Sequence, residues 1–217
     1  AGLEKARGVD RVAAWAGLVK VYRQQEQAPG LLEALGESLA GHGDVKRLDQ
    51  ELARVSAKPK LRDAVLAEAS RQAGKAGDSS PFTRRFAAAR LAVAAKAGSV
   101  VALNRWALAA NKPVASVRDR VLLESFRRQL DELGRQLTID KKYDDASGLL
   151  RAAANDPPLR PFKPQFLFQL SQAYEYGGKT AQALAAIAEA RRFSPRLSKL
   201  PLLDFQEAWI YYHSHQW

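Results

Sequence analysis

The sequence contains neither cysteine nor methionine among its 217 residues. The missing thiols exclude disulfides, a thiol nucleophile, thiolate metal sites and an iron–sulfur cluster within this chain. No stretch approaches the roughly 18 consecutive apolar residues that a membrane-spanning helix needs. Of the three histidines, His213 and His215 lie two positions apart, so a helix would point them in nearly opposite directions. Because no acidic cluster accompanies them, we expect no metal site.

Other arrangements that carry out catalysis are also missing. The carboxylate pairs Asp131-Glu132 and Asp144-Asp145 occupy adjacent positions, which do not face one another on a helix. The glycine-containing stretches "GHGD" and "YGGK" are typical of tight turns between helices and do not form a phosphate-binding loop. The few histidines offer no Ser-His-Asp arrangement. We therefore expect neither an enzyme nor a cofactor.

Acidic residues are scarce in one part of the chain. The formal net charge is +11, yet residues 1–80 are nearly balanced, with 13 basic and 11 acidic side chains. From Arg84 to Arg128 there are ten basic residues against only Asp119 and Glu124. A concentrated positive field attracts acidic partners. We call this segment the basic band; the residues that would contact a polyanion are Arg84, Arg85, Arg90, Lys96, Arg105, Arg118, Arg120, Arg127 and Arg128.

The band has a simpler interpretation, which we favour. Single-stranded nucleic acids usually stack on exposed aromatic side chains, but Phe86, Trp106 and Phe126 all fall at expected core positions. The arginines then form solvated helix faces. An acidic peptide or an anionic polymer is the next candidate, and nucleic acid follows it.

Helical periodicity runs through almost the whole sequence, and β-branched residues are few. Glycine and proline interrupt the apolar pattern at short intervals. The pattern predicts an all-α fold of about eleven helices joined by short antiparallel connections. The predicted helices are Val12–Arg23, Leu31–Leu39, Leu48–Val55, Leu61–Ala69, Phe82–Ala95, Val100–Ala110, Val117–Leu137, Tyr143–Ala153, Phe166–Tyr174, Ala181–Phe193 and Leu202–Tyr212.

The packing pattern of these helices repeats. Adding 37 to Leu130, Leu133, Leu137, Ala146, Leu150, Ala153 and Pro158 gives Leu167, Leu170, Tyr174, Ala183, Ile187, Ala190 and Pro195. The same internal spacing recurs in Trp15, Leu18, Tyr22, Leu31, Leu35 and Ser38, and more weakly in Phe86, Ala89, Val93, Ala102, Trp106 and Ala109. Two amphipathic helices cannot bury their apolar faces alone, so such hairpins stack on one another. The small residues Ala102, Ala146 and Ala183 are expected to let the paired helices approach closely.

This pattern resembles the tetratricopeptide repeat, whose signature is Trp-x2-Leu-Gly-x2-Tyr, then Ala-x3-Phe, then Pro. The stretches "WAGLVKVY", "LDELGRQL" and "LFQLSQAY" carry the first-helix signature with substitutions. The resemblance implies one domain over 1–217, in which antiparallel hairpins stack into a right-handed superhelix. Clear repeats would cover 12–43, 127–160 and 164–197, degenerate repeats 44–113, and residues 199–217 a capping helix or a truncated repeat.

In this family the concave surface is lined by first-helix residues that face away from the second helix. Carried over to the matched units, the resemblance implies a partner-binding groove. Its residues would be Lys20, Arg23, Arg128, Asp131, Arg135, Thr138, Gln165, Phe168, Gln172 and Glu175. The family's clamp for a C-terminal carboxylate uses Asn and Lys, whereas Gln172, Arg135 and Gln169 occupy those positions here, which disfavours that partner class.

Our first hypothesis is therefore a non-enzymatic scaffold that binds a peptide or a partner domain on its concave face. The repeats of this family often serve bacterial envelope export and secretion assemblies, which suggests a periplasmic or envelope-associated setting. The second hypothesis is a basic helical-repeat binder of nucleic acid or an acidic polysaccharide, with an affinity that falls steeply as salt rises. The third is the non-catalytic superhelical part of a larger enzyme, such as a lytic transglycosylase.

Overall fold

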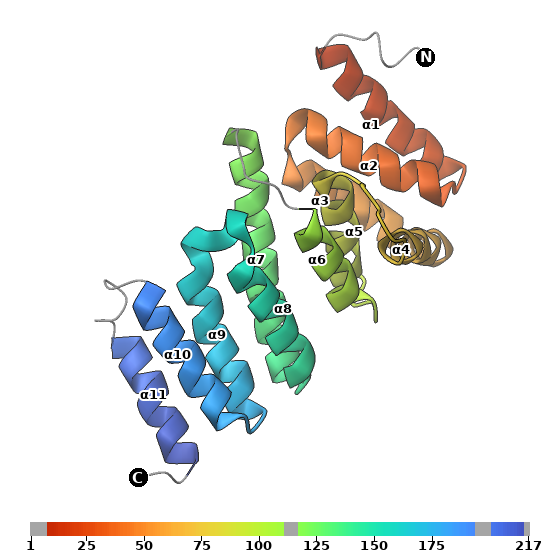
Figure 1. Cartoon of the computed structure of the whole chain (residues 1–217). Helices are drawn as coiled ribbons and strands as arrows, with labels where there is room; N and C mark the ends of the chain where they lie inside the picture. The colour runs from red at the N-terminus through yellow and green to blue at the C-terminus, as the bar shows by residue number, and fades with distance from the viewer. Residues whose placement is uncertain (1–7, 111–116, 194–200, 215–217) are drawn as a thin grey trace. The chain divides into compact units, whose positions relative to one another are not determined.

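A computed structural model describes residues 8–110, 117–193 and 201–214 of the chain (Figure 1). The described residues form eleven α-helices and a short 3-10 helix and contain no strand, which confirms the all-α prediction. They fall into two compact units, Ala1–Ser125 and Phe126–Trp217, whose boundary lies within one helix. The continuation of the two units in one superhelix stays a prediction.

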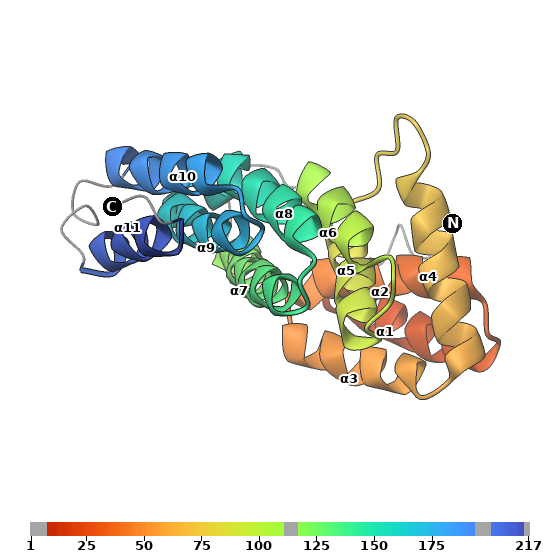
Figure 2. The same cartoon turned by 90° about the horizontal axis from the view of Figure 1, so that it is seen from below.

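The second unit is built from helix hairpins. It contains α7 (Val117–Ile139) from Phe126 onward, α8 (Tyr143–Asn155), a 3-10 helix (Pro157–Phe162), α9 (Lys163–Tyr176), α10 (Thr180–Phe193) and α11 (Pro201–His213). The views show α9 and α11 in one layer with this part of α7, and α8 and α10 in a second layer (Figure 2). We call α7, α9 and α11 the first helices.

The predicted repeat positions form the core of this unit. The leucines and alanines predicted for α7 and α8 are buried, and so are their counterparts in α9 and α10, whereas Tyr174 is half-buried. Gly134 lets α7 approach α8, because a Cβ atom there would lie 2.6 Å from Leu150 Cδ2. At the equivalent position Ser171 is fully buried, and its hydroxyl donates to the Phe168 carbonyl oxygen at 2.7 Å. Pro195 lies outside the described residues.

Contacts between successive hairpins also repeat, at a spacing of 38 residues. Asp131 accepts a hydrogen bond from Gln169 between α7 and α9 at 2.9 Å, and Glu175 pairs with His213 between α9 and α11 at 2.6 Å. Between the second helices, Arg151 forms an ion pair with Glu189 at 2.6 Å. The repeat is 37 residues long, so each of these residues contacts the residue that follows its equivalent in the next hairpin. Such a constant offset is expected for equal units that stack in one direction.

The same turn closes each hairpin. Lys141 and Gly178 adopt left-handed backbone conformations, with φ of 60° and 72°. The amides of Lys142 and Lys179 donate to the carbonyls five residues earlier, at 2.8 Å in both turns, which is the Schellman pattern at a helix C-terminus. In the first unit, Glu26 (φ 55°) and Lys96 (φ 49°) occupy the same place in their turns. Only one of these four positions holds the glycine that would have revealed the turn in the sequence.

Substitutions at the equivalent turn positions Lys141 and Gly178 are expected to change the free energy of unfolding in opposite directions. We expect Lys141→Gly to stabilise the protein by about 0.5–1 kcal/mol, because glycine removes the steric cost of a left-handed backbone. Gly178→Ala is expected to destabilise it by about 1 kcal/mol for the same reason, since no other atoms lie within 4 Å of the new Cβ. Urea unfolding followed by circular dichroism measures both. Changes of equal sign would contradict the shared turn.

The first unit consists mainly of two packed hairpins, α1–α2 and α5–α6, and a third pair of helices, α3–α4, that lies beside them. It contains α1 (Gly8–Gln24), α2 (Ala28–His42), α3 (Val45–Ser56), α4 (Pro59–Ala73), α5 (Phe82–Ala94) and α6 (Val100–Ala109). Helix α2 packs against α1 and α5, and α5 packs against α6, so α2 contacts α5 as α8 contacts α9. The α3–α4 pair lies alongside α5, with α4 also against α2 and α6. The segment expected to hold degenerate repeats therefore contains one pair outside the succession of hairpins.

The predictions for Ala102 and Ala109 were wrong, because both residues are exposed. The buried face of α6 contains Leu103, Trp106 and Ala107 instead. In the other three hairpins the left-handed residue precedes the first buried repeat position of the second helix, which is Leu31, Ala146 or Ala183, by five positions. From Lys96 to Leu103 the interval is seven. The longer turn changes the rotation of α6 about its axis, and Leu103, one position after the predicted Ala102, is the first buried residue of this helix.

Candidate functional site

A groove of about 560 Å³ runs along the first helices of the second unit. It is lined by α7, α9 and the start of α11, and it contains six of the residues predicted for the concave face. These six are Asp131, Arg135, Thr138, Gln165, Phe168 and Gln172. The lining also includes Arg127, Ile139, Pro164, Gln169, Tyr176, Leu202 and Leu203. The repeat register thus brings the central predicted residues together.

Arg127 is the first residue along α7 that lines the groove. Its guanidinium lies 3.4 Å from Asp131 Oδ2 and 3.4 Å from Gln165 Oε1, and it sits 5.0 Å from the ring centroid of Phe162. The cation–π contact and the two polar contacts hold this long side chain in one place. Arg127 is therefore a preorganised cation at the groove.

Arg135, two helical turns further along α7, is held less firmly. It donates two hydrogen bonds to Glu132, at 3.0 and 2.5 Å, and both side chains are more than half exposed. The hydrogen bonds and the charge of Arg135 lower the pKa of Glu132, and Glu132 in turn raises the pKa of Arg135. Exposed ion pairs are weak because water screens them. A carboxylate from a bound molecule can therefore replace Glu132 as the partner of Arg135.

The middle of the groove offers side-chain amides. Gln165, Gln169 and Gln172 lie at helical spacing on α9, and Gln169 is already bonded to Asp131. Gln172 makes no hydrogen bond with the part of the chain that the structure describes. Each carboxamide carries a donor and an acceptor, which match the two polar groups of a peptide unit.

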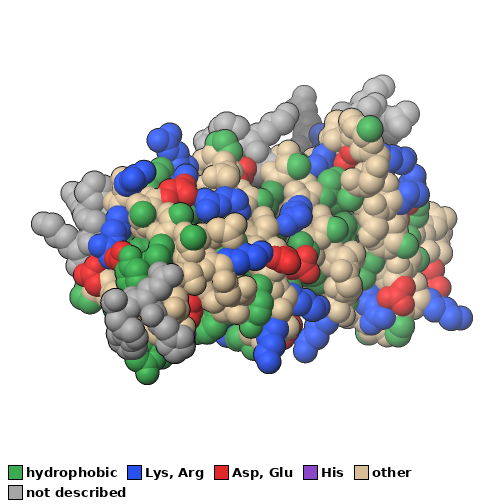
Figure 3. Space-filling model, turned by 60° about the horizontal axis from the view of Figure 1, so that its bottom comes forward, with side chains coloured by type: hydrophobic (Ala, Val, Ile, Leu, Met, Phe, Trp, Pro, Cys, Tyr) green, Lys and Arg blue, Asp and Glu red, His purple; other side chains and the backbone are tan. Residues whose placement is uncertain are grey.

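Apolar side chains border the groove. Phe168 lies between Gln165 and Gln172 along α9, and Tyr176 and Leu202 are each 53% exposed. Ile139, at the end of α7, is exposed as well. In the space-filling view hydrophobic side chains gather on the left, around the C-terminal helix (Figure 3). The groove thus combines cations, amides and apolar surface.

Four predicted groove residues do not line the groove. Glu175 is covered, with its side chain only 5% exposed, because α11 packs over it and His213 bonds to its carboxylate. Arg128 is exposed on α7 but lies outside the lining. Lys20 and Arg23 are on α1 in the first unit, where Lys20 is exposed and Arg23 pairs with Glu51 at 2.5 Å.

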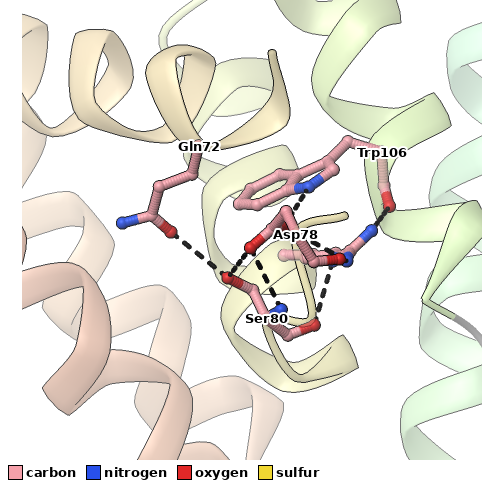
Figure 4. A network of polar contacts seen from close by, with 5 residues as sticks. Gln72, Asp78, Ser80 and Trp106 are labelled. Carbon is pink, nitrogen blue, oxygen red and sulfur yellow. Dashed lines mark hydrogen bonds and ion pairs between the residues drawn. The ribbon is translucent and has the colours of Figure 1, made fainter. Parts of the chain in front are cut away.

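One residue of the basic band, Arg85, is buried in the first unit. Arg85 is 6% exposed and donates hydrogen bonds to the backbone carbonyls of Asp78, Ser80 and Trp106, at 2.7, 3.0 and 2.9 Å. Its guanidinium also lies 3.1 Å from the Asp78 carboxylate. Figure 4 shows Asp78 between Ser80 and Trp106, with Gln72 bonded to the Ser80 hydroxyl. Arg85 therefore holds the 74–81 loop against α6 and cannot contact a polyanion.

Other arginines of the band also have partners within the chain. Arg90 forms a two-armed ion pair with Asp49 of α3, and Arg84 lies 3.3 Å from Glu33 of α2. Arg105, Arg120 and Arg128 are exposed, as is Lys96. Arg127 belongs to the groove, and the side chain of Arg118 lies outside the described part of the chain. The aromatic residues Phe86, Trp106 and Phe126 are buried, as the sequence predicted.

The described histidines bond to neighbouring side chains. His213 contacts Glu175, and His42 Nε2 lies 3.0 Å from the Ser38 hydroxyl. His215 lies outside the described residues. No group of three or more His, Cys, Asp or Glu side chains within the described ranges is arranged to hold a metal ion.

Two groove features were missed by the sequence reasoning, although the sequence contained signals for both. Arg127 had been assigned to the basic band, but it lies one helical turn before Asp131, which was assigned to the groove. Leu202 is 37 residues beyond Gln165, so the register already placed it on the same face.

Comparison of the chain with protein-family models, curated proteins and solved structures gave no match. Within the described ranges, no helix combines the length and the apolar character needed to cross a bilayer.

Proposed function

We propose that the second unit is a non-enzymatic binding module that holds an extended peptide segment of a partner protein in the groove of α7, α9 and α11. The tetratricopeptide-like pattern in the sequence supports this proposal, because six of the ten residues that its register assigns to the concave face line this groove. The observation that carries it is the coincidence of six such residues in one groove of about 560 Å³. The amides of α9 would bind the peptide backbone, and Arg127 and Arg135 would bind its carboxylates.

A selection from a displayed library of random 12-residue peptides tests this function. We expect the double change Arg135→Glu and Gln172→Ala to weaken binding of the selected peptides at least about tenfold, because the groove loses a cation and an amide. Fluorescence anisotropy of a labelled synthetic peptide measures the dissociation constant.

Matched changes on the other layer provide the control. Arg192 and Gln182 are exposed on α10 and lie outside the groove lining. The double change Arg192→Glu and Gln182→Ala makes the same chemical substitutions and should leave the affinity within about twofold, as expected of surface residues outside an interface. Equal losses in the two double variants, or no loss in either, would rule out the groove as the binding site.

A further inference from the structure

Helix α11 presents an uninterrupted apolar stripe on its exposed face. Leu202, Phe205, Trp209 and Tyr212 follow one another at steps of three or four residues, and each is between 37% and 62% exposed. The ring centroids of Phe205 and Trp209 are 5.8 Å apart, and those of Trp209 and Tyr212 are 6.0 Å apart. Exposed aromatic side chains gathered in this way are uncommon on a solvated helix face and mark interaction sites. We call these four residues the α11 stripe.

The repeat register places the stripe on the groove face. Adding 37 to the predicted concave positions of α9, which are Gln165, Phe168, Gln172 and Glu175, gives Leu202, Phe205, Trp209 and Tyr212 in turn. The structure supports this alignment at one end, where Leu202 itself lines the groove. The buried side of α11, with Leu203, Gln206 and Ile210, corresponds likewise to Phe166, Gln169 and Ala173 of α9, of which Phe166 and Ala173 are buried.

The stripe is also free of charge. The acidic residues of α11, Asp204 and Glu207, both pair with Arg191 of α10, at 2.8 and 2.6 Å. His213 is bonded to Glu175 of α9. The carboxylates of α11 that the structure describes are thus paired with a neighbouring helix. The His213 ring, whose centroid lies 4.3 Å from that of Trp209, borders the stripe, and the stripe itself consists of one aliphatic and three aromatic side chains.

Successive first helices therefore differ in the chemistry they offer on this face. Helix α7 presents Arg127 and Arg135, α9 presents carboxamides around Phe168, and α11 presents the stripe. We propose that the peptide carries acidic residues where it crosses α7 and bulky apolar or aromatic residues where it crosses α11. This inference rests on the proposed function and specifies its ligand. The ligand is an extended segment with acidic side chains at one end and apolar side chains at the other.

The length of such a peptide follows from helix packing. Neighbouring helices are separated by about 8–10 Å, so the path from α7 across α9 to α11 is about 20 Å. An extended chain advances about 3.3 Å per residue, and the path requires about six residues. The acidic and apolar ends of the segment should thus be separated by about three or four residues.

Synthetic peptides with this spacing provide the probe. One labelled peptide has two aspartates and two leucines separated by four serines, and a second has the reversed order, because the chain direction is open. In two further peptides serine replaces the leucines or the aspartates. We expect one of the first two to bind, with at least about tenfold weaker binding when the leucines are replaced, as for the loss of a central apolar anchor.

Two adjacent tyrosines of α11 give a matched pair of variants. Tyr212 belongs to the stripe, whereas Tyr211, 40% exposed, lies about 100° away around the helix. Tyr212→Ala and Phe205→Ala should weaken the leucine-containing peptide about tenfold and leave the serine version unchanged. Tyr211→Ala should leave both unchanged. Circular dichroism checks that the variants retain their helices.

The outcomes separate this inference from the proposed function. If Arg135→Glu with Gln172→Ala abolishes binding but the stripe variants do not affect it, the groove stands and the apolar end is wrong. If neither set matters, both proposals fail. A concentration-dependent dimer in sedimentation equilibrium that Tyr212→Ala dissociates would show a second copy on the stripe, and it would overturn the peptide assignment.

Discussion

The Asp78→Asn variant should be less stable than the wild type by about 3 kcal/mol at pH 7. Asp78 accepts hydrogen bonds from Trp106 Nε1 at 2.8 Å and from the side chain and backbone amide of Ser80 at 2.7 and 3.1 Å. It also balances the charge of Arg85. The neutral amide would leave the buried guanidinium without its counter-ion, and hydrogen bonds to charged groups contribute about 1.5–3 kcal/mol each when one partner is removed.

The size of this loss should depend on pH. Burial raises the pKa of Asp78, but the hydrogen bonds from Ser80 and Trp106 and the charge of Arg85 together lower it below its ordinary value. A carboxylate with a lowered pKa in the folded state stabilises the protein above its unfolded pKa of about 3.9, and this contribution disappears as the pH falls. The difference in stability between wild type and Asp78→Asn should therefore be full at pH 7 and shrink below about pH 4.

Urea unfolding at pH 7, 5, 4 and 3, followed by circular dichroism, measures this difference. Hydrogen exchange in α5 and α6 assigns it to the first unit. The control is Asp63→Asn on α4, because Asp63 is 64% exposed and pairs only across the surface with Arg62. A loss in Asp78→Asn that is constant over this pH range, or no larger than that of Asp63→Asn, would contradict the role given to the network.

Gly36→Ala is expected to destabilise the first unit by about 1 kcal/mol or more, although alanine favours helix formation. A Cβ atom at this position of α2 would lie 2.7 Å from Arg84 Cα and 3.0 Å from Arg84 N. These are backbone atoms of α5, so no side-chain rotation relieves the overlap and the two helices must separate. Overpacking of this kind costs about 1–3 kcal/mol, occasionally more, against about 1 kcal/mol gained in helix propensity.

The same change to alanine at Gly17 is expected to have the opposite effect on stability. Gly17 lies on the exposed side of α1, and a Cβ atom there has no other atoms within 4 Å. Gly17→Ala should thus stabilise the protein by up to about 1 kcal/mol through helix propensity alone. Thermal and urea unfolding of both variants compare the two. If Gly36→Ala also proved stabilising, the close approach of α2 and α5 would be wrong.

The arginines of the basic band that are engaged within the first unit also bear on function. The Asp78 network and the ion pair of Arg90 with Asp49 show that part of the basic band stabilises the first unit. Counting arginines in the sequence therefore overestimated the positive surface available to a polyanion. The proposal of a peptide groove depends on a different set of residues, which belong to α7, α9 and α11.

The sequence by itself determined which segments are helices and which of their faces are buried. Apolar spacing needs only helical geometry, so the eleven helices were predicted, and the 37-residue repeat located the core of α7 to α10. It located most of the groove too, because equivalent positions in stacked hairpins share one face. The same register extends to Leu202 and the rest of the α11 stripe, because each lies 37 residues beyond a predicted concave position of α9.

Only the tertiary structure decided which polar side chains are already engaged. Glu175 is covered by His213, and Arg85 is surrounded by carbonyls from a loop and from α6, contacts between residues that no local pattern relates. The longer turn after Lys96 likewise set the rotation of α6, so Leu103 is buried and Ala102 is exposed. Apolar periodicity predicts which face of a single helix is buried. The partner of a charged side chain and the rotation of a helix depend on segments that are distant in the sequence and become neighbours only in the folded chain.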